Sequence, residues 1–181
     1  MTRLFVAAVS AVSLLIVGLG PVRAQTPDRP VPGYGAHTAL PDAGEQPDPT
    51  RVYEVIFDVS IGGSEGQPSR GLDRVARFIN ILAASGVDSE HRRIVAVVHG
   101  AATTAVMSDE AWAKRHDGNA NPSSTLVTQL IAAGVDLRIC GQAMTGNGID
   151  PSELTSGVSV DLAALMTTVH FQQRGYVLVV N

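Results

Sequence analysis

Apolar and polar positions follow two patterns along the chain, one typical of strands and one of helices, and together they predict an α/β fold. Runs rich in β-branched and aliphatic residues are typical of strands and occur at residues 52–59, 94–98, 135–142, 158–160 and 176–180. Apolar residues at helical spacing occur between them at residues 72–83, 126–131 and 162–169. Strands that alternate with helices indicate βαβ units. The pattern therefore predicts a single-domain, three-layer α/β/α fold with a mostly parallel sheet of about five strands.

Two stretches do not follow either pattern. Residues 101–121 are expected to form two short helices, 101–107 and 108–115, and then a loop. A glycine-punctuated loop is expected after Cys140. The loop Gly62–Pro68 follows a strand and precedes a helix, as phosphate-binding loops do, but it lacks the Walker A lysine and the GxGxxG order. Nucleotide binding is therefore not predicted.

The N-terminal part divides into a leader and a linker. Residues 1–24 are expected to be a secretory signal peptide, because an apolar core too short to span a bilayer precedes small residues suited to cleavage. An uncleaved N-terminal anchor is the alternative. Residues 25–50 hold six of the ten prolines and are expected to be a disordered linker, followed by the folded domain at 51–181. A periplasmic or secreted location follows, with no membrane span after cleavage of the signal.

Composition narrows the function classes. The formal charge is −4, and it becomes more negative when Arg3 and Arg23 leave with the signal, so nucleic acid is not an expected partner. A single cysteine excludes an intrachain disulfide. The five histidines and this cysteine show no pair at ligand spacing, so neither a metal nor another cofactor is expected.

Three strand ends carry side chains that can exchange protons or attack electrophiles. The first expected strand ends near Asp58, the second at His99 and the third at Cys140. Binding sites of open parallel sheets lie beyond the carboxyl ends of the strands. Cys140 and His99 are therefore the candidate catalytic residues, with Asp58 in support. The alternatives are a histidine bonded to nearby backbone and an aspartate that stabilises a turn.

Cys140 itself has two interpretations. Arg138 lies two residues earlier, on the same face of the strand, and is positioned to stabilise a thiolate. Backbone N–H groups of residues 141–148, either at a helix start or in a loop nest, would add to this effect. The alternative is that Cys140 is a buried, inert residue, because free cysteine behaves as a small hydrophobe. Arg138 would then pair with Asp136.

The chain resembles the DsrE/DsrF-like family from about Val52 to Val180, in particular its exported members. The resemblance rests on short segments in a consistent order: Val55–Val59, Phe78–Asn80, Val97–Gly100, Leu130–Val135, Ile139–Gln142, Gly148–Ile149, Gly157–Val160 and Gln172–Tyr176. It implies a compact α/β fold that assembles into trimers or hexamers. In the sulfur-relay members a cysteine carries persulfide sulfur between partner proteins, and by position that cysteine is Cys140. Gly141 and Gln142 follow it in the matching segment and are taken as supporting residues.

The leading functional interpretation is a periplasmic protein that carries persulfide sulfur on Cys140 and passes it to an acceptor thiol. Its partners would be thiol-bearing sulfur donor or acceptor proteins. The main alternative is a non-catalytic binding or oligomeric assembly module with an inert cysteine. A cysteine hydrolase built from Cys140, His99 and Asp58 has the required residue types but no local sequence signature. Whether the protein is an enzyme stays open at this point. If active, it is expected to be a sulfur carrier or transferase rather than a hydrolase.

Overall fold

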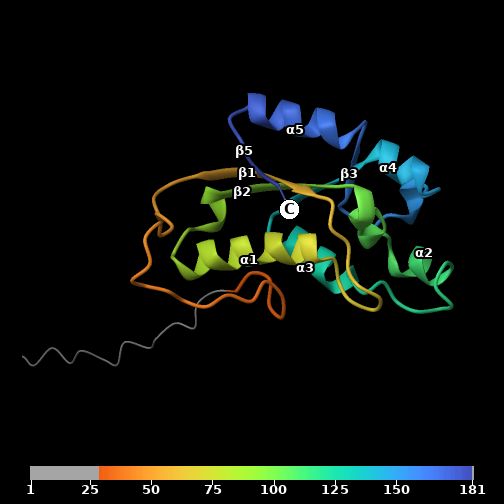
Figure 1. Ribbon diagram of the computed structural model, residues 1–181, viewed down its shortest axis with the longest axis horizontal. Coiled ribbons are helices and arrows are strands. Elements are labelled where there is room, and N and C mark those ends of the chain that lie inside the picture. Colours follow the sequence, from red (N-terminus) through yellow and green to blue (C-terminus); the bar gives the residue numbers. More distant parts are fainter. Residues whose placement is uncertain (1–28, 181) are drawn as a thin grey trace, which may run out of the picture.

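A single five-stranded sheet forms the centre of the molecule (Figure 1). The computed structural model describes residues 29–180. The strand order is β4-β3-β2-β1-β5, and every neighbouring pair is parallel. The strands are β1 (Tyr53–Val59), β2 (Arg92–Val98), β3 (Asp136–Cys140), β4 (Ser159–Asp161) and β5 (Val177–Val180). The α/β fold predicted from the sequence is confirmed.

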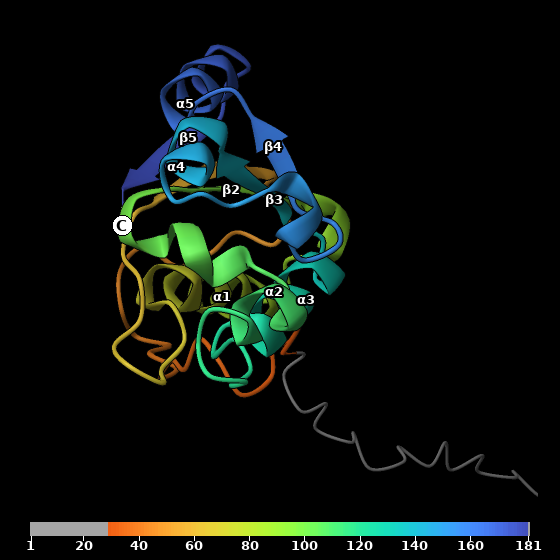
Figure 2. The same cartoon turned by 90° about the vertical axis from the view of Figure 1, so that its right-hand side faces the viewer.

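Helices cover both faces of the sheet (Figures 1 and 2). α1 (Arg70–Ala84) and α3 (Ser124–Ala132) lie on one face, and α5 (Ala164–Gln173) lies on the other. The chain steps from β1 to β4 in one direction across the sheet and then returns to β5 beyond β1. Because parallel crossovers are right-handed, this reversal puts α5 on the opposite face. The remaining helices are short: η1 (Ser89–His91), η2 (Gly100–Val106), α2 (Asp109–Ala113), α4 (Gly141–Gly146) and η3 (Pro151–Glu153).

The two faces of the sheet carry cores of unequal size. The larger apolar cluster fills the space between the sheet and helices α1 and α3. The smaller cluster lies under α5 and consists of Ile56, Val95, Val97, Cys140, Ala164 and Phe171. Side chains alternate between faces along a strand, so β1 sends Val55 and Phe57 to the larger core and Ile56 to the smaller one. The face under α5 is therefore the one that carries Cys140.

Side-chain hydrogen bonds to the backbone shape the two short helices that follow β2. The expected helix at 101–107 is a 3₁₀ helix, η2, whose first turn is closed by Thr103 Oγ1 donating to the Gly100 carbonyl. Ser108 caps α2, because its Oγ accepts from the N–H of Ala111. Two short helices are thus present, as predicted, although the first is tighter than an α-helix.

The loop expected directly after Cys140 is instead helical. α4 begins at Gly141, despite the low helix propensity of glycine. A Cβ at Gly141 would lie 2.8 Å from the carbonyl oxygen of Asp161, so only glycine allows this close approach to β4. Met144 is buried on the inner side of the helix. Tertiary packing therefore overrides the local preference.

Part of the expected linker packs against the domain. Val31 is fully buried, and Asn80 of α1 accepts from its N–H and donates to its carbonyl oxygen. The N–H of Gly35 donates to Asp73, also on α1. Residues 31–35 of the expected linker therefore pack against the domain, because Asn80 and Asp73 bind their backbone. The expected signal peptide, residues 1–24, lies outside the described residues.

The outer side of α5 is apolar and exposed. The helix predicted from the spacing of Leu162, Leu165, Met166 and Val169 is present, but it buries Ala164, Thr167 and Phe171 against the sheet. Leu162 is 73% exposed and Leu165 is 80% exposed. Within residues 29–180, no helix has both the length and the apolar character needed to cross a membrane.

Candidate functional site at the carboxyl ends of the strands

Three predicted residues lie on one face of the sheet, at the carboxyl ends of adjacent strands. Asp58 is on β1, His99 directly follows β2, and Cys140 ends β3. Val98 of β2 pairs with Ile139 of β3, so the residues that follow them, His99 and Cys140, lie beside each other across the two strands. We call Asp58, His99 and Cys140 the thiol site.

Asp58 and His99 are in direct contact. His99 Nε2 is hydrogen-bonded to Asp58 Oδ1, and both side chains are 29% exposed. The backbone N–H of His99 donates to the carbonyl of Val59, which holds the residue in line with the end of β1. A carboxylate on one ring nitrogen fixes the orientation of an imidazole and leaves the other nitrogen, Nδ1, for proton exchange. The pair thus has the form of an oriented general base.

Cys140 is largely covered. It is 7% exposed and belongs to the small core under α5, together with Val97 and Phe171. This burial matches the packing expected of an inert cysteine. It also restricts access to small or extended reactants. Burial therefore limits which reactants could reach the thiol of Cys140.

Arg138 is engaged by carboxylates on either side of it. Its Nε and Nη2 donate to Asp136 at 2.9 and 2.8 Å, and its Nη1 donates to Asp161 at 2.9 Å. Its guanidinium also lies 5.2 Å from the ring centre of Phe171. Burial alone would lower the pKa of Arg138, but the hydrogen bonds and charges of the two aspartates raise it above its ordinary value. The contacts of Arg138 are those of an ion-pair cluster, the alternative that the sequence left open.

Gly141 and Gln142 support the junction between β3 and β4. Gly141 permits the close approach to the backbone of Asp161. Gln142 is exposed, and its Nε2 donates to the carbonyl of Leu162 at 3.3 Å. Both residues hold the chain around Cys140 in place. Within residues 29–180, no cluster of three or more His, Cys, Asp or Glu side chains is arranged to hold a metal ion.

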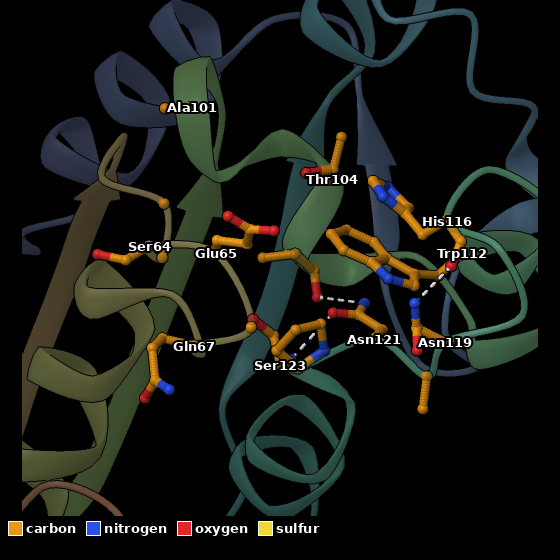
Figure 3. Close-up of a pocket in the computed structure, with 16 residues that line it drawn as sticks. Ser64, Glu65, Gln67, Ala101, Thr104, Trp112, His116, Asn119, Asn121 and Ser123 are labelled. Atoms are coloured by element: carbon orange, nitrogen blue, oxygen red, sulfur yellow. Dashed lines mark hydrogen bonds between the residues drawn. The ribbon is translucent and has the colours of Figure 1, made fainter.

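A second site at the same edge of the sheet was not identified from the sequence (Figure 3). It is a cleft of about 650 Å³ between the loop after β1, helix η2 and the segment from α2 to the start of α3. Its lining residues are Gly62, Gly63, Ser64, Glu65, Gly66, Gln67, Ala101, Thr104, Ala105, Trp112, His116, Asn119, Ala120, Asn121, Pro122 and Ser123. We call it the loop cleft.

The walls of the loop cleft are held by buried polar contacts. The side-chain amide of Asn121 donates to the carbonyls of Ala105 and Met107, and its Oδ1 accepts from the N–H of Ser123. Ser123 Oγ in turn accepts from the N–H of Ser69 at the start of α1. The sequence signal is the small and polar composition of residues 116–121, for which the sequence predicts only a loop.

The loop after β1 and helix η2 meet at very close range beside the cleft. A Cβ at Gly62 would lie 2.5 Å from the carbonyl oxygen of Ala101, so a larger residue at this position would push the two segments apart. These segments continue from Asp58 and His99 respectively. The segments that follow the thiol-site residues Asp58 and His99 therefore also form walls of the loop cleft.

Comparisons with known proteins give a family and two structural neighbours. The structure is similar to a protein of unknown function, MTH1491, from Methanobacterium thermoautotrophicum, with a TM-score of 0.52 and 22% identity over 71% of this chain and 99% of that one. It is also similar to the ychN protein from E. coli, with a TM-score of 0.50 and 20% identity over the same shares of the two chains. No curated protein matches. The sequence profile of the DsrE/DsrF-like family matches residues 54–180, which include every strand and helix of the sheet layers apart from the first residue of β1. The chain therefore belongs to the DsrE/DsrF-like family.

Proposed function

We propose that this protein carries sulfane sulfur as a persulfide on Cys140 and passes it to an acceptor thiol, in the periplasm or outside the cell. The observation that carries the proposal is the placement of Cys140, His99 and Asp58 on one face of adjacent strands, at their carboxyl ends. Membership of a family with a sulfur-relay-type fold supports it. The exported location rests on the leader-like sequence of residues 1–24.

The exchange needs no external oxidant or reductant. His99 accepts the thiol proton, and the Cys140 thiolate attacks the outer sulfur of a donor persulfide. A new S–S bond forms at Cys140 while the S–S bond of the donor breaks, and the donor leaves as a thiolate. An acceptor thiolate then attacks the outer sulfur of the Cys140 persulfide and releases the Cys140 thiolate. Asp58 stabilises the imidazolium form of His99 between the two proton transfers.

The burial of Cys140 fits a sulfur-transfer role better than hydrolysis. A hydrolytic site must admit both a substrate carbonyl and a water molecule beside the nucleophile. Persulfide exchange requires only that one sulfur atom approach along the S–S axis. A 7% exposed thiol therefore favours transfer of a small atom. It also slows attack by bulky thiol reagents.

Intact-mass measurement of the full chain after exposure to polysulfide tests this function. We expect the protein to gain the mass of one sulfur atom, which a small thiol then removes. Cys140→Ser should gain none. His99→Gln should load at least about 10²-fold more slowly, the usual contribution of a general base. His116→Gln, a histidine of the loop cleft, is the matched control and should load at the normal rate.

A mass gain that is equal in the wild type and Cys140→Ser would rule out the proposal. So would the absence of any gain in the wild type under conditions in which a small dithiol is fully persulfidated.

A second candidate function, homo-oligomeric assembly, is favoured by the outer side of α5. Leu165, Met166 and Val169 of this helix and Leu162 just before it are exposed apolar residues. Val160 of β4 and Val177 of β5, at opposite edges of the sheet, are exposed as well. Exposed apolar residues that gather on one helix are typical of an interaction surface. We propose that copies of this chain pack through α5 into trimers or hexamers.

The oligomeric state in solution tests this second candidate. Light scattering coupled to gel filtration should show a trimer or hexamer for the wild type and a monomer for Leu165→Glu, because a charge would be buried in the interface. Gln173→Glu, an exposed substitution near the end of α5, should leave the assembly intact. A monomeric wild type at micromolar concentration would contradict it.

A further inference from the structure

The loop cleft presents a carboxylate and an indole to the same space. Glu65 projects from the loop after β1, and Trp112 projects from α2 on the opposite side (Figure 3). A carboxylate attracts a positive charge by Coulomb interaction, and the face of an indole attracts it through the ring quadrupole. We propose that the loop cleft binds a small organic cation, such as a primary or quaternary amine.

The charges around the cleft favour a cation over an anion. Among the described residues, no lysine or arginine lines the cleft, and Glu65 is its one acidic residue. The two basic residues that follow α2 are paired elsewhere: Lys114 with Glu110 at 2.8 Å and Arg115 with Glu153 at 2.7 Å. The net charge of the chain, −4, adds a weak attraction for cations. A phosphate or carboxylate ligand would find no lysine or arginine in the described cleft walls, and His116 is the one basic side chain among them.

The aromatic wall is held in one orientation. His116 stacks on Trp112 with ring centres 3.9 Å apart and an interplanar angle of 17°. Asn119 Nδ2 donates to the carbonyl of His116, which fixes the turn after the helix. A ring that is already ordered loses little conformational entropy when a ligand binds. His116 covers one face of the indole, so a cation would have to use the opposite face, whose orientation is already fixed.

The polar wall suits the uncharged part of such a ligand. Thr104 is the lining residue whose hydroxyl can both donate and accept, whereas the side chains of Ser64 and Gln67 point away from the space between Glu65 and Trp112 (Figure 3). The volume of about 650 Å³ lies within the range of small-molecule sites. An amine that also carries a hydroxyl or amide group would use both kinds of wall. The inference does not depend on the proposed function, because none of its residues belongs to the thiol site.

Fluorescence titration of the full chain tests the proposal directly, because Trp112 is the single tryptophan of the sequence. Choline, putrescine and inorganic phosphate are the probes, and dimethylbutanol, the uncharged carbon isostere of choline, is the matched ligand control. We expect saturable changes in emission with choline or putrescine, at dissociation constants of about 1 mM or below. The isostere should bind at least about tenfold more weakly, because it lacks the charge.

Glu65→Gln separates charge from shape. It keeps the size and hydrogen-bonding capacity of the side chain, so a folding defect is not expected, and it should weaken choline binding about five- to tenfold. Glu90→Gln, an exposed glutamate in η1, is the matched control and should bind as the wild type does. Calorimetry of Trp112→Phe, which retains a weaker aromatic surface, should show intermediate affinity.

Several results would overturn the proposal. Equal binding of choline and its isostere would make the site one for neutral ligands, and saturable binding of phosphate alone would make it an anion site. Undiminished choline binding by Glu65→Gln would remove the carboxylate from recognition. Absence of a saturable response to either amine up to about 50 mM would leave the cleft without the affinity the proposal requires. Normal choline binding by Cys140→Ser, together with lost persulfide loading, is the result that keeps this inference separate from the proposed function.

Discussion

The thiol site and the loop cleft lie at the same edge of the sheet but are built in different ways. The thiol site consists of strand-end residues whose positions follow from register, and its cysteine is 7% exposed under α5. The loop cleft consists of loops and short helical turns that are held by side-chain amides such as Asn121. Strands thus set the position of the one site, whereas side-chain contacts with backbone set the other.

This difference has a chemical consequence. A thiol that exchanges sulfur needs shielding from water and one aligned proton acceptor, which a packed sheet face provides. A cleft that exchanges a solvated ligand needs open walls with both polar and aromatic groups. The fold therefore offers two separate environments, and substitutions should be able to affect one without the other.

The largest expected effect is a complete separation of the two activities. Cys140→Ser should abolish persulfide loading and leave choline binding unchanged, whereas Glu65→Gln should leave loading unchanged and weaken choline binding. Mass spectrometry and Trp112 fluorescence measure the two properties on the same samples. If either variant impaired both, the sites would act as one, and the comparison would fail.

A smaller effect is expected from the carboxylate behind His99. Asp58→Asn keeps a hydrogen-bonding group at the position but removes the charge that stabilises the imidazolium. Persulfide loading should slow about tenfold or more, with no change in choline binding. Loading rates followed by quenched intact-mass measurements check this. An unchanged rate would mean that Asp58 only holds His99 in position through its hydrogen bond.

The frame of the loop cleft can be weakened without touching its binding groups. Asn121→Ala removes the side-chain amide that donates to the carbonyls of Ala105 and Met107, of which Met107 keeps Thr155 Oγ1 as a donor, and it should lower the free energy of unfolding by about 1–3 kcal/mol. Choline affinity should fall with it, whereas persulfide loading of the folded protein should not. Denaturant unfolding and the fluorescence titration measure both.

Asn80→Ala is the matched control for this prediction. Asn80 makes a similar set of buried backbone contacts, to Val31 and Tyr34, on the α1 side of the molecule. It should cost a similar amount of stability but leave choline affinity intact. Reduced affinity in both variants would show that the cleft responds to general loosening of the fold.

The smallest expected effect concerns the ion-pair cluster beside the thiol. Arg138 is neutralised by Asp136 and Asp161, so the cluster carries one excess negative charge. Asp161 is the register partner of Cys140. Asp161→Asn should accelerate thiolate-dependent loading by about two- to fivefold, the size of a partly exposed charge interaction. A slower rate would show that the structural role of Asp161, which accepts from Thr167, outweighs its charge.

The sequence predicted the elements that depend on periodicity. The strand ends at Asp58, His99 and Cys140 could be located because apolar runs stop there, and the parallel order follows from alternation with helices. What it did not predict depends on contacts between distant residues. The chain after Cys140 needs a glycine because β4 leaves no room for a side chain, and residues 31–35 pack on the domain because Asn80 and Asp73 bind their backbone.

The same limit explains why the loop cleft was missed. Glu65, Trp112 and Asn121 are far apart in sequence and share no periodic pattern, so only the folded chain brings them together. Likewise, apolar spacing predicted helix α5 but not that three of its apolar residues, Leu165, Met166 and Val169, would be exposed. A hydrophobic stripe shows that a helix has an apolar face, but it does not show what that face contacts.

The contact of Val31 with Asn80 places the start of the described chain on the α1 side of the sheet, so the two faces of the sheet are not equivalent. The described chain enters the fold on the side of α1, whereas Cys140 lies on the opposite face, under α5. The segment 31–35 therefore lies on the side of the sheet away from the thiol. A partner that approaches across the α5 face meets the cysteine side of the sheet without passing the point where the chain enters.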